Sequence, residues 1–569
     1  MSSLFGPAYL TRRGFVLVIS LIFLAIFAAL AVAFASFADG NLQMAADQSR
    51  ANTALAAAYS GLQCARFFVS TVPLPSTSVN NISRQDADQV WSLLASYIAA
   101  NAPKGTSVQG PVSFNGVQEV SISGIQLGNG SFSVSFYRYD TDPNTLVIRS
   151  TGRSGPVCRT LGMTAQIKKK SPVLQYGVAS RGRMWLTGDT TVYGSIYSSW
   201  DVETISPFNM TSDSRVFGSI NTVLTLDQVK RQNWQLETLN EHDQPMDING
   251  NPLGTNFQDR YHGPEDQIQG YHEGINYGQP DYENIPELDI ANYDTSMYKQ
   301  MAHYTQTATV NGNLIYEGEI PELGVTVTEY FPHAAGNYSQ PRDSSSLKLR
   351  RYVYENKTFR DVILPSIKTS NTDRRAALFR NCTFEGILYI DCAQGPSSTV
   401  SNTPYNNVRF ENCTFKGVIV TNTPRTLWSN WWKQNCLYFT GTATFNNQSS
   451  IKEATILAPH FNVNLGNTNP QQTDNNVLTG VIVGGIVDVR GNAQIYGTIV
   501  SMADTTCYTS GYVTNIGATL SDGGSETTEL GDVGTIVIRP DPFQMLPSGI
   551  TTPIVIEPDG ASYQEIYDE

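Results

Sequence analysis

Histidine and acidic side chains gather in one polar, tyrosine-rich stretch of the chain, between about residues 225 and 345. Its charged groups are Glu241-His242-Asp243, Tyr261-His262, Tyr271-His272-Glu273 and Asp281–Asp289. Carboxylates of this kind are ligands for Ca²⁺, and His262, His272 and Glu273 are ligand types for a transition metal. Neither spacing matches a metal motif such as HExxH or an EF-hand loop. We therefore interpret the stretch as solvated loops, leave Ca²⁺ unsupported, and predict no metal and no cofactor.

Acidic residues elsewhere do not form a catalytic pattern. Asp391 and Asp488 lie near predicted strands, but no Asp-Asp pair or comparable constellation accompanies either of them. The sequence also has no GxSxG, no P-loop and no CxxC pair. We predict that the chain is not an enzyme and assign no catalytic residue.

Two internal repeats indicate a stacked β architecture. Phe379–Tyr389 aligns with Phe410–Val420, and Leu186–Ser198 aligns with Val489–Ser501, with a shorter copy at Val216–Ile220. Short runs of alternating apolar residues, separated by Gly and Asn, are typical of a parallel β-solenoid, whose coils are stable only when several stack. A β-sandwich with coincidental likeness between these segments is the alternative. Asn381 and Asn412 occupy matching positions, which favours a structural asparagine ladder at a turn.

The repeat also places two cysteines in register. Cys382 and Cys413 hold the same position in their copies, so the solenoid predicts that their backbones lie about 4.8 Å apart. That spacing suits either a disulfide or a stacked pair of free thiols.

Composition favours strands and disfavours a nucleic-acid surface. The chain has 28 Tyr, 24 Phe and 46 Gly, and aromatic residues are enriched in strands while Gly is enriched in turns. The formal net charge is −13, and no basic cluster extends beyond Lys168–Lys170. Seven cysteines among 569 residues are too few for a disulfide framework.

An uncharged apolar run extends from Phe15 to Phe37, directly after Arg12-Arg13-Gly14. Its about 23 residues would span roughly 34 Å as a helix, enough to cross a bilayer core. Arg12 and Arg13 precede the run and no acid appears before Asp39, an arrangement that keeps the short N-terminus cytoplasmic. The sequence predicts one membrane span with the bulk of the chain exported.

The helix is expected to continue beyond the membrane, because small residues follow and no proline occurs before Pro73. Gln85–Ala100 predicts a second, amphipathic helix. Strands are predicted at Val117–Ile125, Ser131–Tyr139, Thr145–Ser150 and Arg159–Lys168.

The N-terminus has three interpretations. A cleaved secretory signal has an apolar region of about 7–15 residues, shorter than this one. A plain membrane anchor fits the length but leaves Arg12–Phe15 unexplained. A class III prepilin leader is cut between Gly14 and Phe15, after which Phe15 becomes the N-methylated first residue.

At these positions the sequence resembles type IV pilins and type II secretion pseudopilins. The matching residues are Arg12, Arg13, Gly14, Phe15, Leu17, Ile19 and Leu21. The resemblance is closest to the N-terminal domain of PilX-type minor pilins. Most pilins carry Glu at the fifth mature position, where it pairs with the N-terminal amine of a neighbouring subunit. Here that position is Ile19, as in GspK-like tip pseudopilins, which argues against a major, repeating subunit.

The resemblance implies a domain plan and a role. The expected segments are a leader (1–14), a transmembrane helix (15–37), an extended helix (38–70), a pilin-like α+β head (71–170), first solenoid coils (171–224), a polar insertion (225–345), the main solenoid (346–520), and a terminal strand with an acidic tail (521–569).

The expected role is a minor pilin or pseudopilin of the inner membrane that primes assembly, caps a filament tip or adheres to a surface. Its expected partners are prepilin peptidase, other pilins and a surface glycan or protein, with no nucleic acid. The alternatives are an anchored adhesin outside any filament and an anchored polysaccharide-active enzyme.

Overall fold

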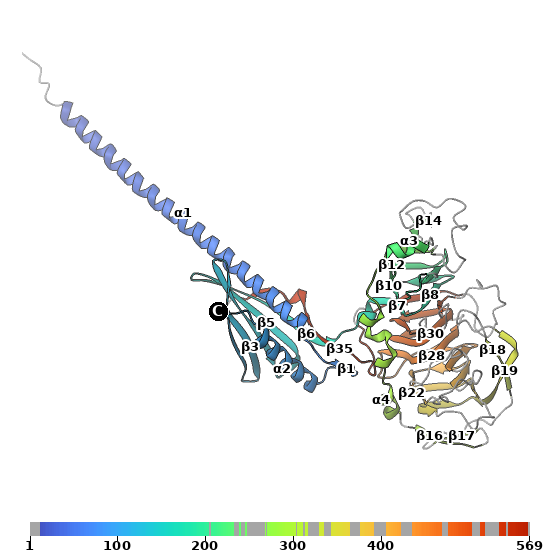
Figure 1. Cartoon of the computed structure of the whole chain (residues 1–569). Coiled ribbons are helices and arrows are strands. Elements are labelled where there is room, and N and C mark those ends of the chain that lie inside the picture. The colour runs from blue at the N-terminus through green and yellow to red at the C-terminus, as the bar shows by residue number, and fades with distance from the viewer. Residues whose placement is uncertain are drawn as a thin grey trace, which may run out of the picture. The chain divides into compact units, whose positions relative to one another are not determined.

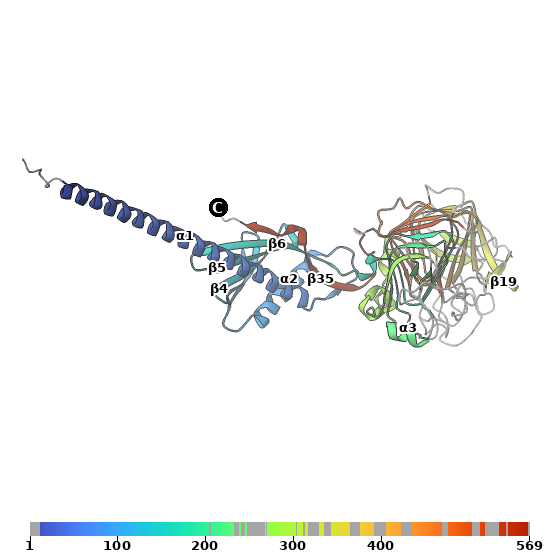
Figure 2. The ribbon, with the colours of Figure 1, turned by 90° about the horizontal axis from the view of Figure 1, so that it is seen from above.

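The computed structural model describes residues 12–566 except 204–205, 233–237, 240–244, 247–267, 269, 303, 311–312, 317–328, 335–342, 365–375, 392–405, 423–434, 469–475, 503–512, 518–533 and 542–543. This part of the chain divides into two compact units. The first, the head, is made of residues 12–75, 82–168 and 554–566, and the second, the solenoid unit, of residues 76–81 and 169–553. Both are mainly β, apart from one long N-terminal helix, which confirms the predicted fold class (Figure 1, Figure 2).

Helix α1 (Arg12–Thr71) is a single helix of 60 residues. It ends two residues before Pro73, as expected from the donor that proline removes and the turn with which it clashes. Side chains from Phe15 to Arg50 are almost all exposed, whereas one face from Ala54 onward is buried. The helix therefore has a free half and a half that packs on the head.

The head packs α1 and helix α2 (Arg84–Asn101) against an antiparallel sheet. Successive strands of that sheet are β2 (Ser107–Phe114), β3 (Val117–Leu127), β4 (Gly130–Tyr139), β5 (Asp142–Ser154) and β6 (Val157–Lys169). Strand β4 alternates buried and half-buried residues along its whole length, because only one face of the sheet meets the helices. Ser83 and Asp86 form a capping box at the start of α2.

The C-terminal segment completes the head. Ile554 and Ile556 of strand β35 (Thr552–Pro558) are buried in the head core, and β36 (Gln564–Ile566) pairs antiparallel with β6. The solenoid unit is thus inserted in the sequence between two parts of one head. The predicted plan placed these residues in a terminal segment of their own, and the structure assigns them differently because they bury alternate apolar side chains there.

The solenoid unit is a stack of mostly parallel strands (Figure 1), whose pairings form three columns. The first column contains β7 (Tyr176–Ser180), β10 (Ser195–Ser198), β25 (Val418–Thr421) and β32 (Ile499–Ser501). The second contains β8 (Arg183–Leu186), β11 (Phe208–Met210), β21 (Ala376–Arg380), β23 (Asn406–Glu411), β26 (Asn435–Thr440) and β33 (Val513–Ile516). The third contains β9 (Thr190–Val192), β24 (Thr414–Phe415), β27 (Thr444–Phe445), β29 (Val477–Thr479), β31 (Ala493–Tyr496) and β34 (Ile536–Arg539). Longer strands turn a corner and belong to two columns: β12 (Arg215–Thr222), β15 (Tyr271–Asn276), β20 (Thr358–Leu364), β22 (Thr383–Ile390), β28 (Ala454–Thr468) and β30 (Val481–Gly491).

Two columns of stacked rings fill one inner corner of the solenoid. One consists of Tyr354, Phe379, Phe410 and Phe439, with neighbouring ring centroids 5.1, 5.6 and 5.2 Å apart. The other consists of Phe359, Phe384, Phe415 and Phe445, with spacings of 5.0, 5.4 and 5.0 Å. At the turn between them, Asn356, Asn381, Asn412 and Gly441 have positive φ angles of 55°, 53°, 53° and 63°. The asparagine ladder predicted at this turn is confirmed.

The coils do not stack in the order of the sequence. The chain enters at β7, and the coils of β10, β12 and β15 follow on one side of it. The coils of β22, β25, β28, β30 and β32 approach β7 from the other side, and β32, β33 and β34 pair with β7, β8 and β9. The entering and leaving ends of the solenoid unit therefore belong to neighbouring coils in the middle of the stack.

A crossing segment of residues 277–302, here called the strap, connects β15 to the far end of the stack. Its short helical turns are η4 (Tyr282–Asn284), η5 (Pro286–Leu288), η6 (Ile290–Asn292) and α4 (Ser296–Met301). Leu288 and Tyr293 of the strap pack with outward side chains of the first column such as Val483, so that its strands are buried on both faces. Part of the predicted polar insertion is thus a solenoid strand, β15, and part is this strap.

Candidate functional site

The free half of α1 presents an apolar surface that carries no charge from Phe15 to Phe37. Phe15 is 69% exposed and Ile19 is 36% exposed, and none of the most apolar window of the helix is buried. By length and composition the helix can cross a membrane. Because α1 begins at Arg12, the predicted processing junction between Gly14 and Phe15 lies in its first turn, after Arg12 and Arg13.

The other half of α1 is held to the head by small residues. Ala54, Ala58 and Ala65 are fully buried. A Cβ added to Gly152 of β5 would lie 2.0 Å from the Ala54 carbonyl oxygen and 2.4 Å from the Ala58 nitrogen. A Cβ added to Gly61 of α1 would lie 2.0 Å from the Ser150 hydroxyl oxygen. Helix backbone and sheet backbone therefore touch, which ties the free half rigidly to the head.

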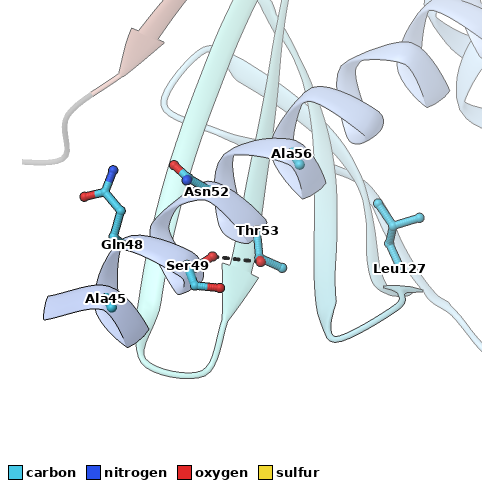
Figure 3. A pocket seen from close by; sticks show the side chains of 7 residues that line it. All are labelled: Ala45, Gln48, Ser49, Asn52, Thr53, Ala56 and Leu127. Atoms are coloured by element: carbon cyan, nitrogen blue, oxygen red, sulfur yellow. Dashed lines mark hydrogen bonds between the residues drawn. The ribbon is translucent and has the colours of Figure 1, made fainter. Parts of the chain in front are cut away.

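A shallow hollow of about 690 Å³ lies on the outer side of α1, next to the β3–β4 turn. Its lining is Ala45, Gln48, Ser49, Asn52, Thr53, Ala56 and Leu127 (Figure 3). The Thr53 hydroxyl donates a hydrogen bond to the Ser49 carbonyl oxygen, 2.8 Å away. The lining contains no titratable side chain, so the hollow has no evident catalytic chemistry.

A row of exposed rings and one guanidinium crosses the outer face of the third column. The Tyr193 and Phe217 rings stack at 5.2 Å, and the Phe217 and Tyr271 rings lie 5.4 Å apart. The Arg539 guanidinium lies 4.8 Å from the Tyr193 ring centroid, and its Nη1 donates to the Tyr496 hydroxyl at 3.4 Å. We call these five residues the outer ladder. Sequence reasoning aligned Tyr193-Gly194 with Tyr496-Gly497 but did not predict that both tyrosines face solvent.

A buried acid and a buried base lie where the strap meets the two ends of the solenoid unit. Glu287 is fully buried, and burial raises the pKa of its carboxyl to about 7. Burial lowers the pKa of Lys169 to about 8, although the charge of Glu287 acts in the opposite direction. The Lys169 ammonium donates to the Ile550 carbonyl oxygen at 2.7 Å, and the Tyr293 hydroxyl donates to the Glu287 carbonyl oxygen at 2.6 Å. The Lys169 contact joins the entering and leaving segments of the solenoid unit, while the Tyr293 contact lies within the strap.

Comparison with known proteins gives little beyond this geometry. No protein-family model matches the sequence, and no curated protein matches it. Among solved structures, the chain is similar to the crystal structure of the competence-associated pilin ComZ from Thermus thermophilus, at 11% identity and a TM-score of 0.25. The match covers 91% of this chain and 98% of that one. A TM-score this low establishes neither a shared fold nor a shared function.

The architecture of the head is more informative. A single apolar N-terminal helix extends freely at one end and packs across an antiparallel sheet at the other. This arrangement of one helix across an antiparallel sheet is the one that the N-terminal resemblance to pilins implies for the head.

The two predicted cysteines lie in neighbouring coils. Thr383 pairs with Thr414, and the residues before them, Cys382 and Cys413, are both buried free thiols. The Cys382 Sγ donates to the Tyr354 carbonyl oxygen and the Cys413 Sγ to the Phe379 carbonyl oxygen, both at 3.4 Å. Burial raises the pKa of the Cys413 thiol, whereas a hydrogen bond with Cys413 lowers the pKa of the Cys382 thiol.

The acidic candidates are not brought together. Asp391 follows β22 and forms an ion pair with Lys299 at 2.7 Å, and it accepts a hydrogen bond from Asn422 at 2.8 Å. Asp488 is buried in the second-column part of β30, beside Asn464 and Asn515. The two carboxylates lie in different columns, with the coils of β25 and β28 between them.

The structure describes some of the histidine candidates and not others. His242 and His262 lie outside the described residues, while His272 is buried in β15 and Glu273 is exposed. Within the described part of the chain, no three His, Cys, Asp or Glu side chains form a group able to hold a metal ion.

Proposed function

We propose that this chain is a minor pilin or pseudopilin-like subunit that enters a type IV pilus or a type II secretion-type filament through α1. The observation that carries the proposal is the continuity of α1, whose exposed apolar stretch from Phe15 to Phe37 continues without a break into the half packed on the head. An apolar helix fixed to an exported head is suited both to storage in the inner membrane and to packing among similar helices. Its partners would be prepilin peptidase and other pilins.

We propose that the subunit is present in few copies or lies at an end of the filament. Ile19 offers no carboxylate to the N-terminal amine of a neighbouring subunit, which removes the contact used by repeating subunits of the family that this chain resembles. The solenoid unit is also far larger than the head that carries it, so many copies would crowd a filament wall. Assembly priming, tip capping and surface adhesion are roles that suit such a subunit.

The proposal is tested by mapping the N-terminus of the full chain produced with and without a prepilin peptidase. We expect a mature chain that begins at N-methylated Phe15 only when the peptidase is present. Gly14→Val should remain uncut, because a branched side chain at the junction obstructs the peptidase. Gly40→Val, the same change farther along α1, should be processed normally. A wild-type chain that stays uncut would remove the filament proposal.

In that outcome the second candidate, a membrane-anchored surface adhesin outside any filament, would account for the molecule. The observation that favours it is the outer ladder, an exposed aromatic surface on the exported unit. An anchored polysaccharide-active enzyme has less support, because Asp391 and Asp488 do not converge.

A further inference from the structure

The outer ladder extends over five consecutive coils of the third column. From one end these coils carry Tyr496 on β31, Arg539 on β34, Tyr193 after β9, Phe217 on β12 and Tyr271 on β15. Neighbouring parallel strands are about 4.8 Å apart, so the row has the regular step of the coils. A ligand that repeats along its length would meet similar groups at each step.

These rings are not needed to fill the core. Tyr193, Phe217 and Tyr496 are 45%, 39% and 40% exposed, whereas Phe410 of the inner column is fully buried. Their stacking holds them in one orientation on the surface. Rings that are exposed and already ordered lose little conformational entropy when a ligand binds.

Unpaired positive charge accompanies the rings in an otherwise acidic protein. Arg539 and Arg215, which lies opposite Tyr271 in the register, form no ion pair with any described residue. The formal net charge of the chain is −13. Guanidinium groups have several N–H donors in a planar array that suits carboxylates.

We propose that the outer ladder binds a linear polysaccharide that carries carboxylate groups, such as a uronate-containing glycan. The exposed parts of the rings would contact the apolar C–H faces of successive sugars, while Arg539 and Arg215 pair with carboxylates and the tyrosine hydroxyls with sugar hydroxyls. This deepens the proposed surface role by naming a ligand class, and it rests on that role only for the access of the ladder to the cell exterior.

A single-stranded nucleic acid is the other polyanion to consider, and two observations disfavour it. The ladder rings already stack on one another, so bases cannot insert between them. Binding of a phosphate backbone draws on many cations, and among the described residues two arginines without an ion pair, Arg539 and Arg215, accompany this row.

The test is titration of the full chain in detergent with a defined oligogalacturonate, a cello-oligosaccharide of equal length and a thymidine oligonucleotide. We expect saturable binding of the oligogalacturonate, weaker at high salt, and at least tenfold weaker binding of the neutral oligomer. Tyr193→Ala should weaken binding of both glycans about tenfold, because it removes an exposed ring contact and the ring on which Arg539 lies. Arg539→Gln should weaken the binding of the oligogalacturonate selectively.

Two variants act as matched controls. Phe114→Ala removes an exposed ring from the head, and Arg153→Gln removes an exposed arginine there, so neither should change glycan binding. Hydrogen exchange of the solenoid strands establishes that Tyr193→Ala and Arg539→Gln remain folded. Failure of wild-type chain to bind oligogalacturonate, or equal binding by folded Tyr193→Ala, overturns the proposal. Binding of the oligonucleotide that is lost in both ladder variants would reassign the surface to nucleic acid. None of these outcomes affects the N-terminal processing test.

Discussion

The head and the solenoid unit achieve close packing in opposite ways. In the head, the backbone of α1 touches the sheet because Gly152 has no side chain and faces Ala54 and Ala58, while Gly61 of α1 faces Ser150. In the solenoid unit, the inner corner is filled by columns of rings, each in contact with the same residue type in the coils on either side. The contact between α1 and the sheet depends on missing side chains, and the inner corner of the solenoid unit depends on large ones.

The difference follows from what each unit must bring together. A helix laid across a sheet gains contact area when its backbone comes close, and each added methyl group separates the two layers. Stacked coils are held about 4.8 Å apart by their hydrogen bonds, a distance at which rings of successive coils meet. Adding atoms between α1 and the sheet should therefore damage the head, and removing rings from the inner corner should damage the solenoid unit.

Removal of a ring from the inner column is expected to have the largest effect. Phe410→Ala leaves a cavity among four rings, Phe379, Phe384, Phe415 and Phe439, and should lower the free energy of unfolding of the solenoid unit by about 3–5 kcal/mol. Urea unfolding of the full chain in detergent measures the loss. Phe217→Ala, the same substitution in the outer ladder, is the control and should cost clearly less. Equal losses would show that the inner rings have no special part in stability.

The next largest expected effect is a change in the stability of the solenoid unit with pH. The folded-state pKa of Glu287 is raised from 4.5 to about 7, so its contribution to stability is present below about pH 4.5 and is lost as pH rises through 7. The full loss corresponds to about 3 kcal/mol at roughly 1.4 kcal/mol per pH unit. Lys169 acts in the opposite direction at higher pH, because its lowered pKa makes stability rise between about pH 8 and 10.5.

Glu287→Gln should remove most of the stability change between pH 4.5 and 7, measured as the melting temperature of the solenoid unit across that range. Glu283→Gln, an exposed carboxylate in the same strap, is the control and should leave the profile unchanged. The assignment fails if the wild-type profile is flat over this range or if Glu287→Gln keeps the full slope.

Addition of one methyl group to the head should have the smallest effect of the three. Gly152→Ala forces the backbone of α1 away from β5 and should destabilise the head by about 1–3 kcal/mol. Gly560→Ala adds the same group in the head where no atom lies within 4 Å, so it should be nearly neutral. Hydrogen exchange of β5 in both variants provides the measurement. Similar exchange in the two would contradict the backbone contact inferred for Gly152.

Much of the local structure follows from the sequence. The predicted helix over 15–70 and the strand over Ser131–Tyr139 agree with α1 and β4, because helix formers without proline and strict apolar alternation each suit one backbone geometry. The repeat of Phe379 and Phe410 determined the register of neighbouring coils, since equivalent residues of adjacent coils must pair. The candidate processing junction at Gly14–Phe15 also comes from the sequence alone.

The order of the coils and the final surfaces were decided only by the tertiary structure. Nothing local in Tyr176–Ser180 indicates that it pairs with Ile499–Ser501, because contacts between segments so far apart leave no periodic signal in either one. The packing of Ile554–Ile566 in the head is likewise not indicated by the local sequence of that segment. Phe217 and Phe410 both lie in short apolar strands, yet one ring faces solvent and the other the core. Which face of a strand is covered depends on distant segments, and so the outer ladder became visible only in the folded molecule.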